Sequence, residues 1–265
     1  MSTALPHPQL ISSRDNPLFK EVKRLAHGST DYRKFGRFWA EGDHLVRAAL
    51  LRGVRPVMGI FSESFWPLAQ EKYGQAASKN IVMPDVLYDS LSALESPARM
   101  GFVFDLPAAS AIRSDMATVV LDRVQDAGNV GAILRSASAF GFKQIIALKG
   151  TAALWSPKVL RAGMGAHWGL QLVESADLAA LDQLRLPLLV TSSHRGDFLH
   201  QMLQKRELPM PCVWALGHEG QGICAELEAR AKQHVRIAQP GGEESLNVAT
   251  AAAICLHASA TAQLG

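Results

Sequence analysis

The amino-acid sequence predicts an α/β protein with a C-terminal domain built on a parallel sheet and a smaller α/β domain before it. After residue 117, short apolar stretches alternate regularly with helical stretches, whereas short helices and strands are mixed before residue 107. The stretch between them carries Pro, Ala and Ser, which is typical of a linker. Hydrophobic residues form 48% of the 265-residue chain, enough to fill buried cores. We therefore predict domains over 1–106 and 117–265, joined by a linker over 107–116.

The C-terminal elements follow from apolar runs bounded by turn residues. Such runs predict strands over 117–122, 143–148, 186–193, 212–217 and 235–239. Helical patterns lie over 129–140, 156–166, 223–233 and 246–264. Asn129 and Ser245 are residue types that cap helix starts, and Pro157 suits a first helical turn. Strands that alternate with helices form parallel βαβ units in an open sheet.

The N-terminal part mixes shorter elements. Residues 17–26 place Leu18, Val22 and Leu25 at a helical spacing. The stretch 38–51 predicts a strand that runs into a helix, and three short strands are predicted over 57–62, 80–84 and 100–106. This mixture predicts the smaller α/β domain.

Composition excludes several classes of protein. The sequence has no run of about 18 apolar residues, so we expect no transmembrane helix. Residues 1–10 lack the basic start and apolar run of a secretory signal. Cys212, Cys224 and Cys255 are too few and too widely spaced for a disulfide framework or a zinc site. They predict small buried thiols in a protein of the reducing cytoplasm, without a metal.

Basic residues cluster near the start of the chain although the net charge is only +3. Seven basic residues but only three acids lie between Arg14 and Arg37, with Phe19, Tyr32, Phe35 and Phe38 among them. A phosphate-rich partner with stacking bases would suit such a surface. A solvated helix face explains the same charges equally well.

Polar and Gly-rich residues follow three of the predicted C-terminal strands, at 122–131, 217–222 and 239–247. The carboxyl ends of parallel strands lie at one edge of a sheet, where open α/β sheets bind their ligands. The sequence therefore predicts one ligand site shared by these loops.

The first of these loops leads into a helix. Gly128 and Gly131 allow a close approach of the backbone, and Arg135 lies six positions after Asn129. By itself this pattern also fits an ordinary helix with a surface arginine. The segment lacks G-x-G-x-x-G, which argues against a dehydrogenase or another enzyme that binds a dinucleotide.

The other two loops are less specific individually. Gly217, Gly220 and Gly222 leave backbone groups open to a ligand, although Glu219 would also suit an acid in the first turn of a helix. The run 239–242 leaves its strand abruptly, before Ser245 opens an alanine-rich helix. Its small residues fit core packing or a dimer interface.

Together the three motifs resemble the SpoU (TrmH-like) family of RNA 2′-O-ribose methyltransferases in the SPOUT superfamily. The family's Asn-x-Gly-x-x-x-Arg element is similar to Asn129, Gly131 and Arg135, and its Gly-x-Glu-x-x-Gly element to Gly217, Glu219 and Gly222. Its Ser-Leu-Asn-Val element matches 245–248. Residues 11–25 and 38–50 also resemble the RNA-binding domain found in many members.

The resemblance implies a deep C-terminal trefoil knot, a homodimer formed through the catalytic domain, and S-adenosylmethionine bound mainly by main-chain groups. It implies the cofactor-binding residues Leu216, Gly217, Gly222, Ile237, Gln239, Ser245, Leu246 and Asn247. It implies the catalytic residues Arg135, Asn129, Glu219, Ser245 and Asn247. The chain departs from the family at Ala238 and Gln239, where Pro and Met are usual, and at Gly163, where Ser is frequent.

The expected substrate is RNA, and the N-terminal resemblance favours ribosomal over transfer RNA. The residues expected to bind it are Arg14, Lys20, Lys23, Arg33, Lys34, Arg37 and Arg161. A non-catalytic RNA-binding protein on the same fold is the alternative, and the intact motif residues argue against it.

Overall fold

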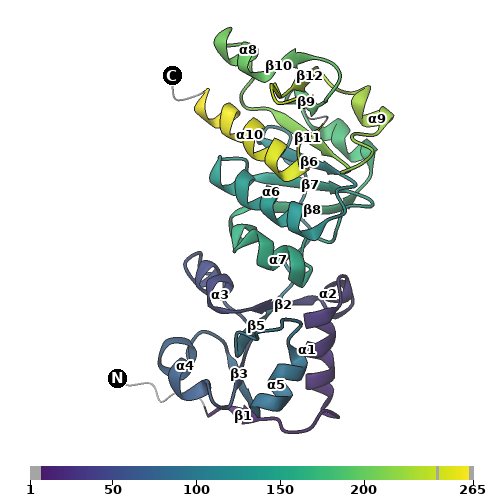
Figure 1. Ribbon diagram of the computed structural model, residues 1–265. Helices are drawn as coiled ribbons and strands as arrows, with labels where there is room; N and C mark the ends of the chain where they lie inside the picture. The colour runs from purple at the N-terminus through teal and green to yellow at the C-terminus, as the bar shows by residue number, and fades with distance from the viewer. Residues whose placement is uncertain (1–6, 243–244, 263–265) are drawn as a thin grey trace. The chain divides into compact units, whose positions relative to one another are not determined.

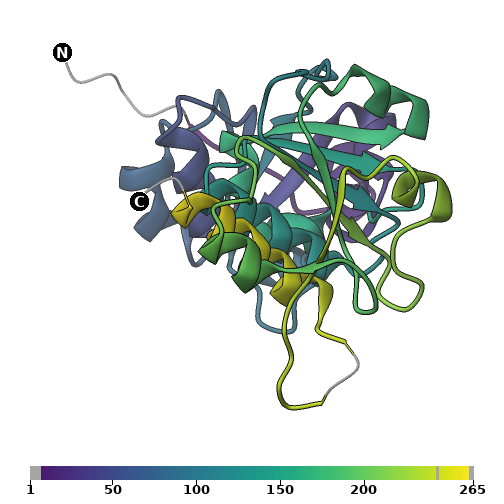
Figure 2. The ribbon, with the colours of Figure 1, turned by 90° about the horizontal axis from the view of Figure 1, so that it is seen from above.

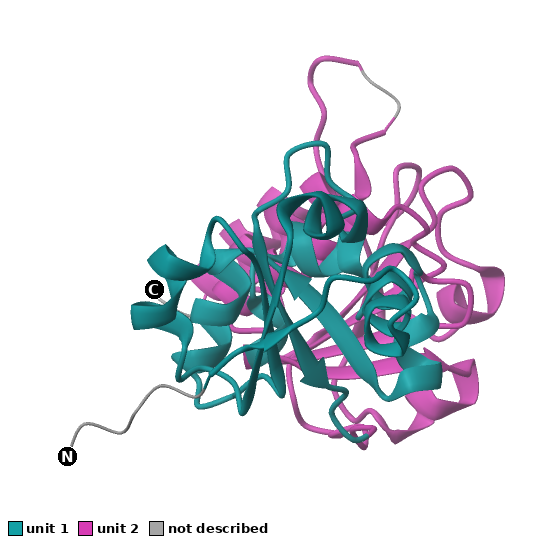
Figure 3. Cartoon of the chain, turned by 90° about the horizontal axis from the view of Figure 1, so that it is seen from below, with its two compact units in different colours: residues 1–108, 155–168 teal, residues 109–154, 169–265 magenta. Residues whose placement is uncertain are grey.

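The computed structural model describes residues 7–242 and 245–262. The chain divides into two compact units (Figure 3). Unit 1 comprises residues 1–108 with 155–168, and unit 2 comprises 109–154 with 169–265. Residues 106–113, which overlap the linker predicted over 107–116, contain no helix or strand.

Unit 1 is built on a five-stranded sheet with the order β1-β4-β3-β5-β2. β4 pairs in parallel with β1 and β3, whereas β5 pairs antiparallel with β3 and β2. The strands are β1 Gln9–Leu10, β2 Arg37–Glu41, β3 Met58–Ser62, β4 Lys79–Met83 and β5 Met100–Asp105.

The helices of unit 1 bury one apolar face each. In α1 (Pro17–His27) this face is Phe19, Val22, Leu25 and Ala26, and the Asn16 side chain caps the helix through the Leu18 N–H. The other helices are α2 Asp31–Phe35, α3 Asp43–Leu50, α4 Trp66–Tyr73 and α5 Asp85–Leu91. The predicted small α/β domain is therefore present.

Residues 155–168 pack with unit 1, although the sequence placed them in the C-terminal domain. They contain α7 (Pro157–Gly163) and a 3₁₀ turn, Ala166–Gly169. Trp155 and Trp168 pack against Phe38 with tilted rings, at centroid distances of 4.7 and 5.6 Å, and Trp168 also contacts Phe104 at 4.8 Å. This aromatic packing explains the grouping.

Unit 2 is built on a seven-stranded parallel sheet with the order β10-β12-β9-β11-β6-β7-β8 (Figure 1). The strands are β6 Thr118–Asp122, β7 Gln144–Leu148, β8 Gln171–Ala176, β9 Leu188–Thr191, β10 Asp197–Phe198, β11 Val213–Gly217 and β12 Gln233–Arg236. The α/β fold with a parallel sheet, predicted from the alternation of elements, is confirmed.

Different elements pack against the two faces of this sheet. α6 (Ala127–Ala139) and α10 (Val248–Thr261) lie side by side (Figures 1 and 2), and the Trp214 indole donates to Ser259 Oγ of α10 at 2.9 Å. The alternate side chains, such as Val120 and Ala215, pack with Leu181 and Leu227. The remaining elements are α8 Leu199–Gln204, α9 Ala225–Glu228 and a 3₁₀ turn, Leu178–Gln183.

Two helix starts differ from the sequence expectation. Asp126, not Asn129, caps α6, because its side chain accepts the Asn129 N–H at 2.8 Å. Asn247, not Ser245, caps α10 by accepting the N–H groups of Ala249 and Thr250.

The helix predicted over 223–233 is much shorter in the structure, where α9 covers only Ala225–Glu228. The Lys232 N–H bonds to the Leu188 carbonyl at 2.7 Å, and β12 begins at Gln233. Pairing with β9 thus draws the end of the segment into the sheet.

Candidate functional site

A cavity of about 630 Å³ opens where three loops of unit 2 converge at the carboxyl ends of the sheet strands, a size typical of small-ligand sites. The turn 217–223 follows β11, the segment 237–248 follows β12, and residues 191–194 follow β9. The sequence predicted the first two of these loops as parts of one site.

Most of the residues expected to bind a cofactor line this cavity: Gly217, Gly222, Ile237, Gln239, Ser245, Leu246 and Asn247. Leu216 does not line it, because its side chain is fully buried in β11. The backbone of the chain passes very close to itself here. A Cβ at Gly217 would lie 2.2 Å from the carbonyl carbon of Gly222, so a larger residue would disrupt this turn.

A chain of side-chain hydrogen bonds joins the three sequence motifs. The Asn247 amide donates to Asn129 Oδ1 at 2.9 Å, and the Asn129 amide donates to Glu219 Oε1 at 3.1 Å. Asn129 is separated from Glu219 by 90 positions and from Asn247 by 118 positions, yet the three residues meet at the start of α6. These hydrogen bonds bring the three motifs together, but the loop 122–131, which the sequence placed in the shared site, contributes no residue to the lining of the cavity.

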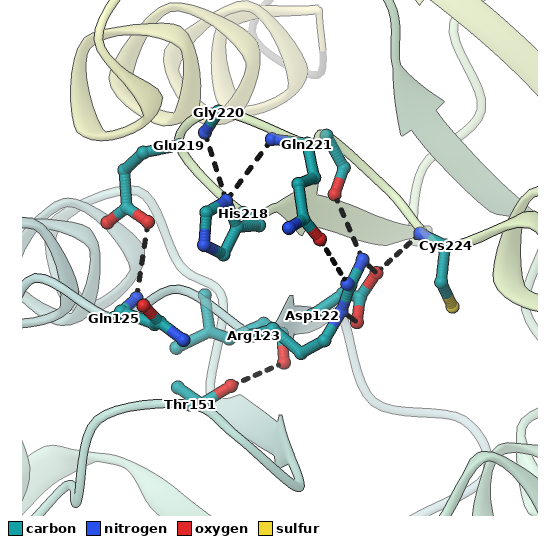
Figure 4. Close-up of polar contacts among 11 residues, drawn as sticks. Asp122, Arg123, Gln125, Thr151, His218, Glu219, Gly220, Gln221 and Cys224 are labelled. Atoms are coloured by element: carbon teal, nitrogen blue, oxygen red, sulfur yellow. Dashed lines mark hydrogen bonds and ion pairs between the residues drawn. The ribbon is translucent and has the colours of Figure 1, made fainter.

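Glu219 is fixed by the backbone of the loop between β6 and α6. Its carboxylate accepts the N–H group of Gln125 at 3.2 Å (Figure 4). It also accepts the N–H group of Asp126 at 3.1 Å and a hydrogen bond from the Asn129 amide. Partial burial raises the pKa of this carboxyl, but the hydrogen bonds outweigh it and the pKa is lowered overall. Glu219 is thus a structural anion rather than the first-turn helix acid considered from the sequence.

His218 shapes the same turn from within. Its Nδ1 accepts the N–H groups of Gly220 at 3.0 Å and of Gln221 at 3.2 Å (Figure 4). Two donors at Nδ1 require that this nitrogen carry no proton, so the ring proton resides on Nε2. The sequence analysis missed this role, although His218 lies inside the predicted motif.

Arg135 lies apart from this hydrogen-bonded network. It is exposed on α6, and no hydrogen bond or ion pair of its side chain is found within residues 7–242 and 245–262. The position is six residues, or one and two-thirds turns, beyond Asn129. Its guanidinium is therefore available to a partner.

The residues expected to bind RNA all belong to unit 1. Several of them are already engaged locally: Lys20 pairs with Asp15 at 2.9 Å, Arg37 with Asp105 at 3.1 Å, and Lys23 lies over the Phe19 ring. Arg14, Lys20, Lys23, Arg33 and Lys34 are exposed, whereas Arg37 and Arg161 are half-buried. These basic side chains thus remain at least partly accessible to solvent.

The sequence analysis also missed the loop after β9. Thr191, Ser192, Ser193 and His194 line the cavity together with Glu228 of α9. The strand prediction over 186–193 extended into this loop, and the position of β9 between β11 and β12 brings it to the site. The signal available in the sequence was the polar run at a strand's carboxyl end.

The cysteines and other metal-binding residue types offer no metal site in the described part of the chain. Cys212 and Cys255 are buried, and burial raises the pKa of each thiol to about 12; Cys224 is half-buried. None of the helices described is long and apolar enough to cross a membrane.

This architecture defines an α/β protein that binds a small ligand at the carboxyl edge of a parallel sheet. A model of the SpoU rRNA Methylase family matches residues 116–257. Over 250 residues the chain is 28% identical to the 23S rRNA (guanosine(2553)-2′-O)-methyltransferase RlmP of Bacillus subtilis, covering 93% of this chain and 97% of that protein.

Solved structures agree with the family match. The crystal structure of an RNA 2′-O ribose methyltransferase is similar with a TM-score of 0.78 and 27% identity, covering 97% of this chain and all of the other. The fold is also shared with the SpoU methyltransferase AviRb from Streptomyces viridochromogenes in complex with AdoMet, at a TM-score of 0.81, 22% identity, and coverage of 94% and 99%. The chain belongs to the SpoU rRNA methylase family, which confirms the resemblance stated from its motifs.

Proposed function

We propose that this protein transfers a methyl group from S-adenosylmethionine to a ribose 2′-hydroxyl of ribosomal RNA. The observation that carries the proposal is the convergence of Asn129, Glu219 and Asn247 beside one cavity. Membership of the family and the similarity to the Bacillus subtilis enzyme that acts on 23S rRNA support it.

The cavity fits S-adenosylmethionine in chemistry as well as in size. Close-passing glycines at 217 and 222 leave backbone groups for an adenine or ribose, and Gln239 Oε1 is buried without a hydrogen-bond partner among the described residues. Gly217, Gly222, Ile237, Gln239 and the segment 245–247 would hold the cofactor, which supplies an activated methyl group. Leu216 supports this site from inside β11.

The protein's own groups have separate tasks in this proposal. Methyl transfer needs the ribose oxygen held about 3–3.5 Å from the methyl carbon, which is a positioning problem. Arg135 grips a phosphate beside the target ribose and stabilises the developing alkoxide, because a guanidinium is a strong bidentate donor and a poor base. Asn129, Glu219, Ser245 and Asn247 fix the cavity and the start of α6 around the reactants.

The RNA contacts assigned to unit 1 belong to the same proposal. The exposed residues Arg14, Lys20, Lys23, Arg33 and Lys34, together with Arg37 and Arg161, would neutralise phosphates of the substrate. We further propose a homodimer through unit 2 and the trefoil knot of the family. Both extend the family resemblance, and α6 and α10 supply small residues suited to an interface.

The central test is methyl incorporation into 23S rRNA from labelled S-adenosylmethionine, followed by mapping of 2′-O-methyl positions. Arg135→Ala should reduce kcat/KM by about 10²-fold or more, as expected for the loss of a group that stabilises transition-state charge. Cofactor binding should stay near that of the unmodified protein, because Arg135 does not line the cavity.

Arg135→Lys is the matched control, since it keeps the charge but loses the bidentate fork. It should recover only part of the activity. Turnover of Arg135→Ala close to that of the unmodified protein would refute the role of Arg135, and a lack of S-adenosylmethionine binding by the unmodified protein would refute the function itself.

A further inference from the structure

An ion pair outside the cavity braces the turn that lines it. Asp122, the last residue of β6, is 2% exposed, and Arg123 Nε donates to its Oδ1 at 2.9 Å. Neither residue lines the cavity. Any influence of this pair on a ligand must therefore act through the residues that it touches.

The pair forms hydrogen bonds with three groups at residues 221–224, at the end of the turn that follows β11. Arg123 Nη1 donates to Gln221 Oε1 at 2.9 Å, and Nη2 lies 3.4 Å from the Gly222 carbonyl oxygen (Figure 4). The Cys224 N–H donates to Asp122 Oδ2 at 2.6 Å. A side chain, a carbonyl and an amide of one turn are thus all held by two adjacent residues.

The backbone around Arg123 is itself held in place. Arg123 adopts φ +57°, a left-handed conformation that is uncommon for a residue with a side chain. Thr151 Oγ1 donates to the Leu121 carbonyl at 3.0 Å, and the Ala152 N–H donates to the Val124 carbonyl at 2.9 Å. A Cβ at Gly150 would lie 3.1 Å from Arg123 Cγ, so glycine there leaves room for the arginine.

The turn needs such external support because its own backbone is permissive. Gly217, Gly220 and Gly222 each lower the cost of alternative conformations. Glu219 ties the first half to the loop after β6, and the pair ties the second half to the end of β6. Together they hold the turn at both ends against one neighbouring segment.

We propose that Asp122 and Arg123 are positioning residues that keep the turn 217–223 in the shape that receives the cofactor. The inference rests on the proposed use of the cavity for S-adenosylmethionine. It assigns to this pair a role in cofactor affinity that requires no contact with cofactor or RNA.

Arg123→Lys is the informative substitution. A lysine keeps the charge beside Asp122, but its single nitrogen cannot also reach Gln221 and the Gly222 carbonyl. The Kd and KM for S-adenosylmethionine should rise about tenfold while kcat at saturating cofactor stays within about threefold, the pattern of lost uniform binding. Lys205→Gln, an exposed substitution elsewhere in unit 2, should change none of these quantities.

Hydrogen exchange of the ligand-free protein supplies the second measurement. In Arg123→Lys and in Gln221→Ala, the amides of residues 220–224 should exchange about tenfold faster, because a local anchor of the turn is lost. This result does not depend on any ligand, so it separates failure of the brace from failure of the proposed function.

Unchanged exchange in both variants overturns the inference. So does a kcat that falls in proportion to a lowered melting temperature while KM stays constant, since that pattern describes a purely structural pair. If Arg123→Lys does not fold, Gln221→Ala decides the question by exchange alone, because Gln221 is exposed and contributes no core packing.

Discussion

At the scale of single residues, the site depends on polar atoms whose partners are backbone groups of a neighbouring loop. Glu219 and His218 each accept two backbone N–H groups, and Asn247 does so at the start of α10. These residues fix the backbone conformation of the loops, whereas metal ligands or nucleophiles would act on a bound group directly. Their removal should therefore alter binding before it alters overall stability.

His218 offers a direct test of this view. His218→Ala removes the acceptor for the Gly220 and Gln221 N–H groups and should weaken S-adenosylmethionine binding by roughly fivefold to thirtyfold, since one or both of two bonds worth about 1 kcal/mol each would count toward affinity. His218→Asn should stay within about twofold of the unmodified protein, because an Asn oxygen accepts the same N–H groups in an Asx turn. Titration calorimetry measures both, and equal losses in the two variants would contradict the prediction.

Residue types in the sequence located most of this site, but not the assignment of individual roles. Both Ser245 and Asn247 are capping residues, and only the hydrogen bonds of the folded chain select Asn247. His218 was indistinguishable from any polar turn residue until the direction of its ring was known. Arg123 was hidden for the same reason, because its partners Gln221 and Gly222 lie almost a hundred positions away.

At the scale of elements, the helix starts connect the motifs. α6 begins beside Glu219, and α10 begins at Asn247, whose amide reaches Asn129 on α6. The two helices also pack together along their length. Asn247 therefore has two separable functions: it caps α10, and its amide hydrogen-bonds to Asn129.

A pair of substitutions separates them. Asn247→Ala should lower the free energy of unfolding by about 1 kcal/mol through loss of the cap, and should also weaken cofactor binding. Asn247→Asp keeps an acceptor for the Ala249 and Thr250 N–H groups but cannot donate to Asn129.

The aspartate variant should therefore regain the stability, as measured by urea unfolding, without regaining affinity for S-adenosylmethionine. Recovery of both quantities by Asn247→Asp would show that the bond to Asn129 has no part in binding.

Hydrophobic periodicity predicted most strands and helices of unit 2. The exceptions depend on strand pairing, solvent exposure or the short length of the element. The helix predicted over 223–233 is cut short because Lys232 and Gln233 pair with β9. β8 and β10 escaped prediction because one is a half-exposed strand and the other has only two residues. Periodicity reports burial, so a strand without a continuous buried face gives little signal.

At the scale of the whole molecule, strand order is what the sequence withholds. The order β12-β9-β11-β6 places strands from distant parts of the chain next to one another, and no local pattern encodes it. The same holds for residues 155–168, which join unit 1 through Trp155 and Trp168 although they lie between segments of unit 2. The α/β class and the shared ligand edge needed only the alternation of elements.

The acid sensitivity of unit 2 should reflect its anchored carboxylates. For Asp122, burial raises the pKa, but hydrogen bonds from Arg123 and the Cys224 N–H outweigh it, and the pKa is lowered; Glu219 is lowered similarly. A carboxyl with a lowered folded pKa contributes stability above its unfolded pKa, near 4, and loses it as the pH falls through the folded value.

Urea unfolding at several pH values checks this. Asp122→Asn should be less stable than the unmodified protein at pH 6, and the difference should shrink as the pH falls below about 4, because the unfolded chain of the unmodified protein then binds a proton that the folded carboxylate still excludes. A difference that stays constant down to pH 3 would contradict it.

The bond between Asn129 and Glu219 means that the glycine turn and the first turn of α6 share one arrangement. We expect a ligand that orders the turn also to order the helix start that leads to Arg135, which would couple the binding of the two ligands. Thermodynamic reciprocity then requires that RNA strengthen the hold on the methyl donor by the same factor as the donor strengthens the hold on RNA. Dissociation of either product would then weaken the binding of the other.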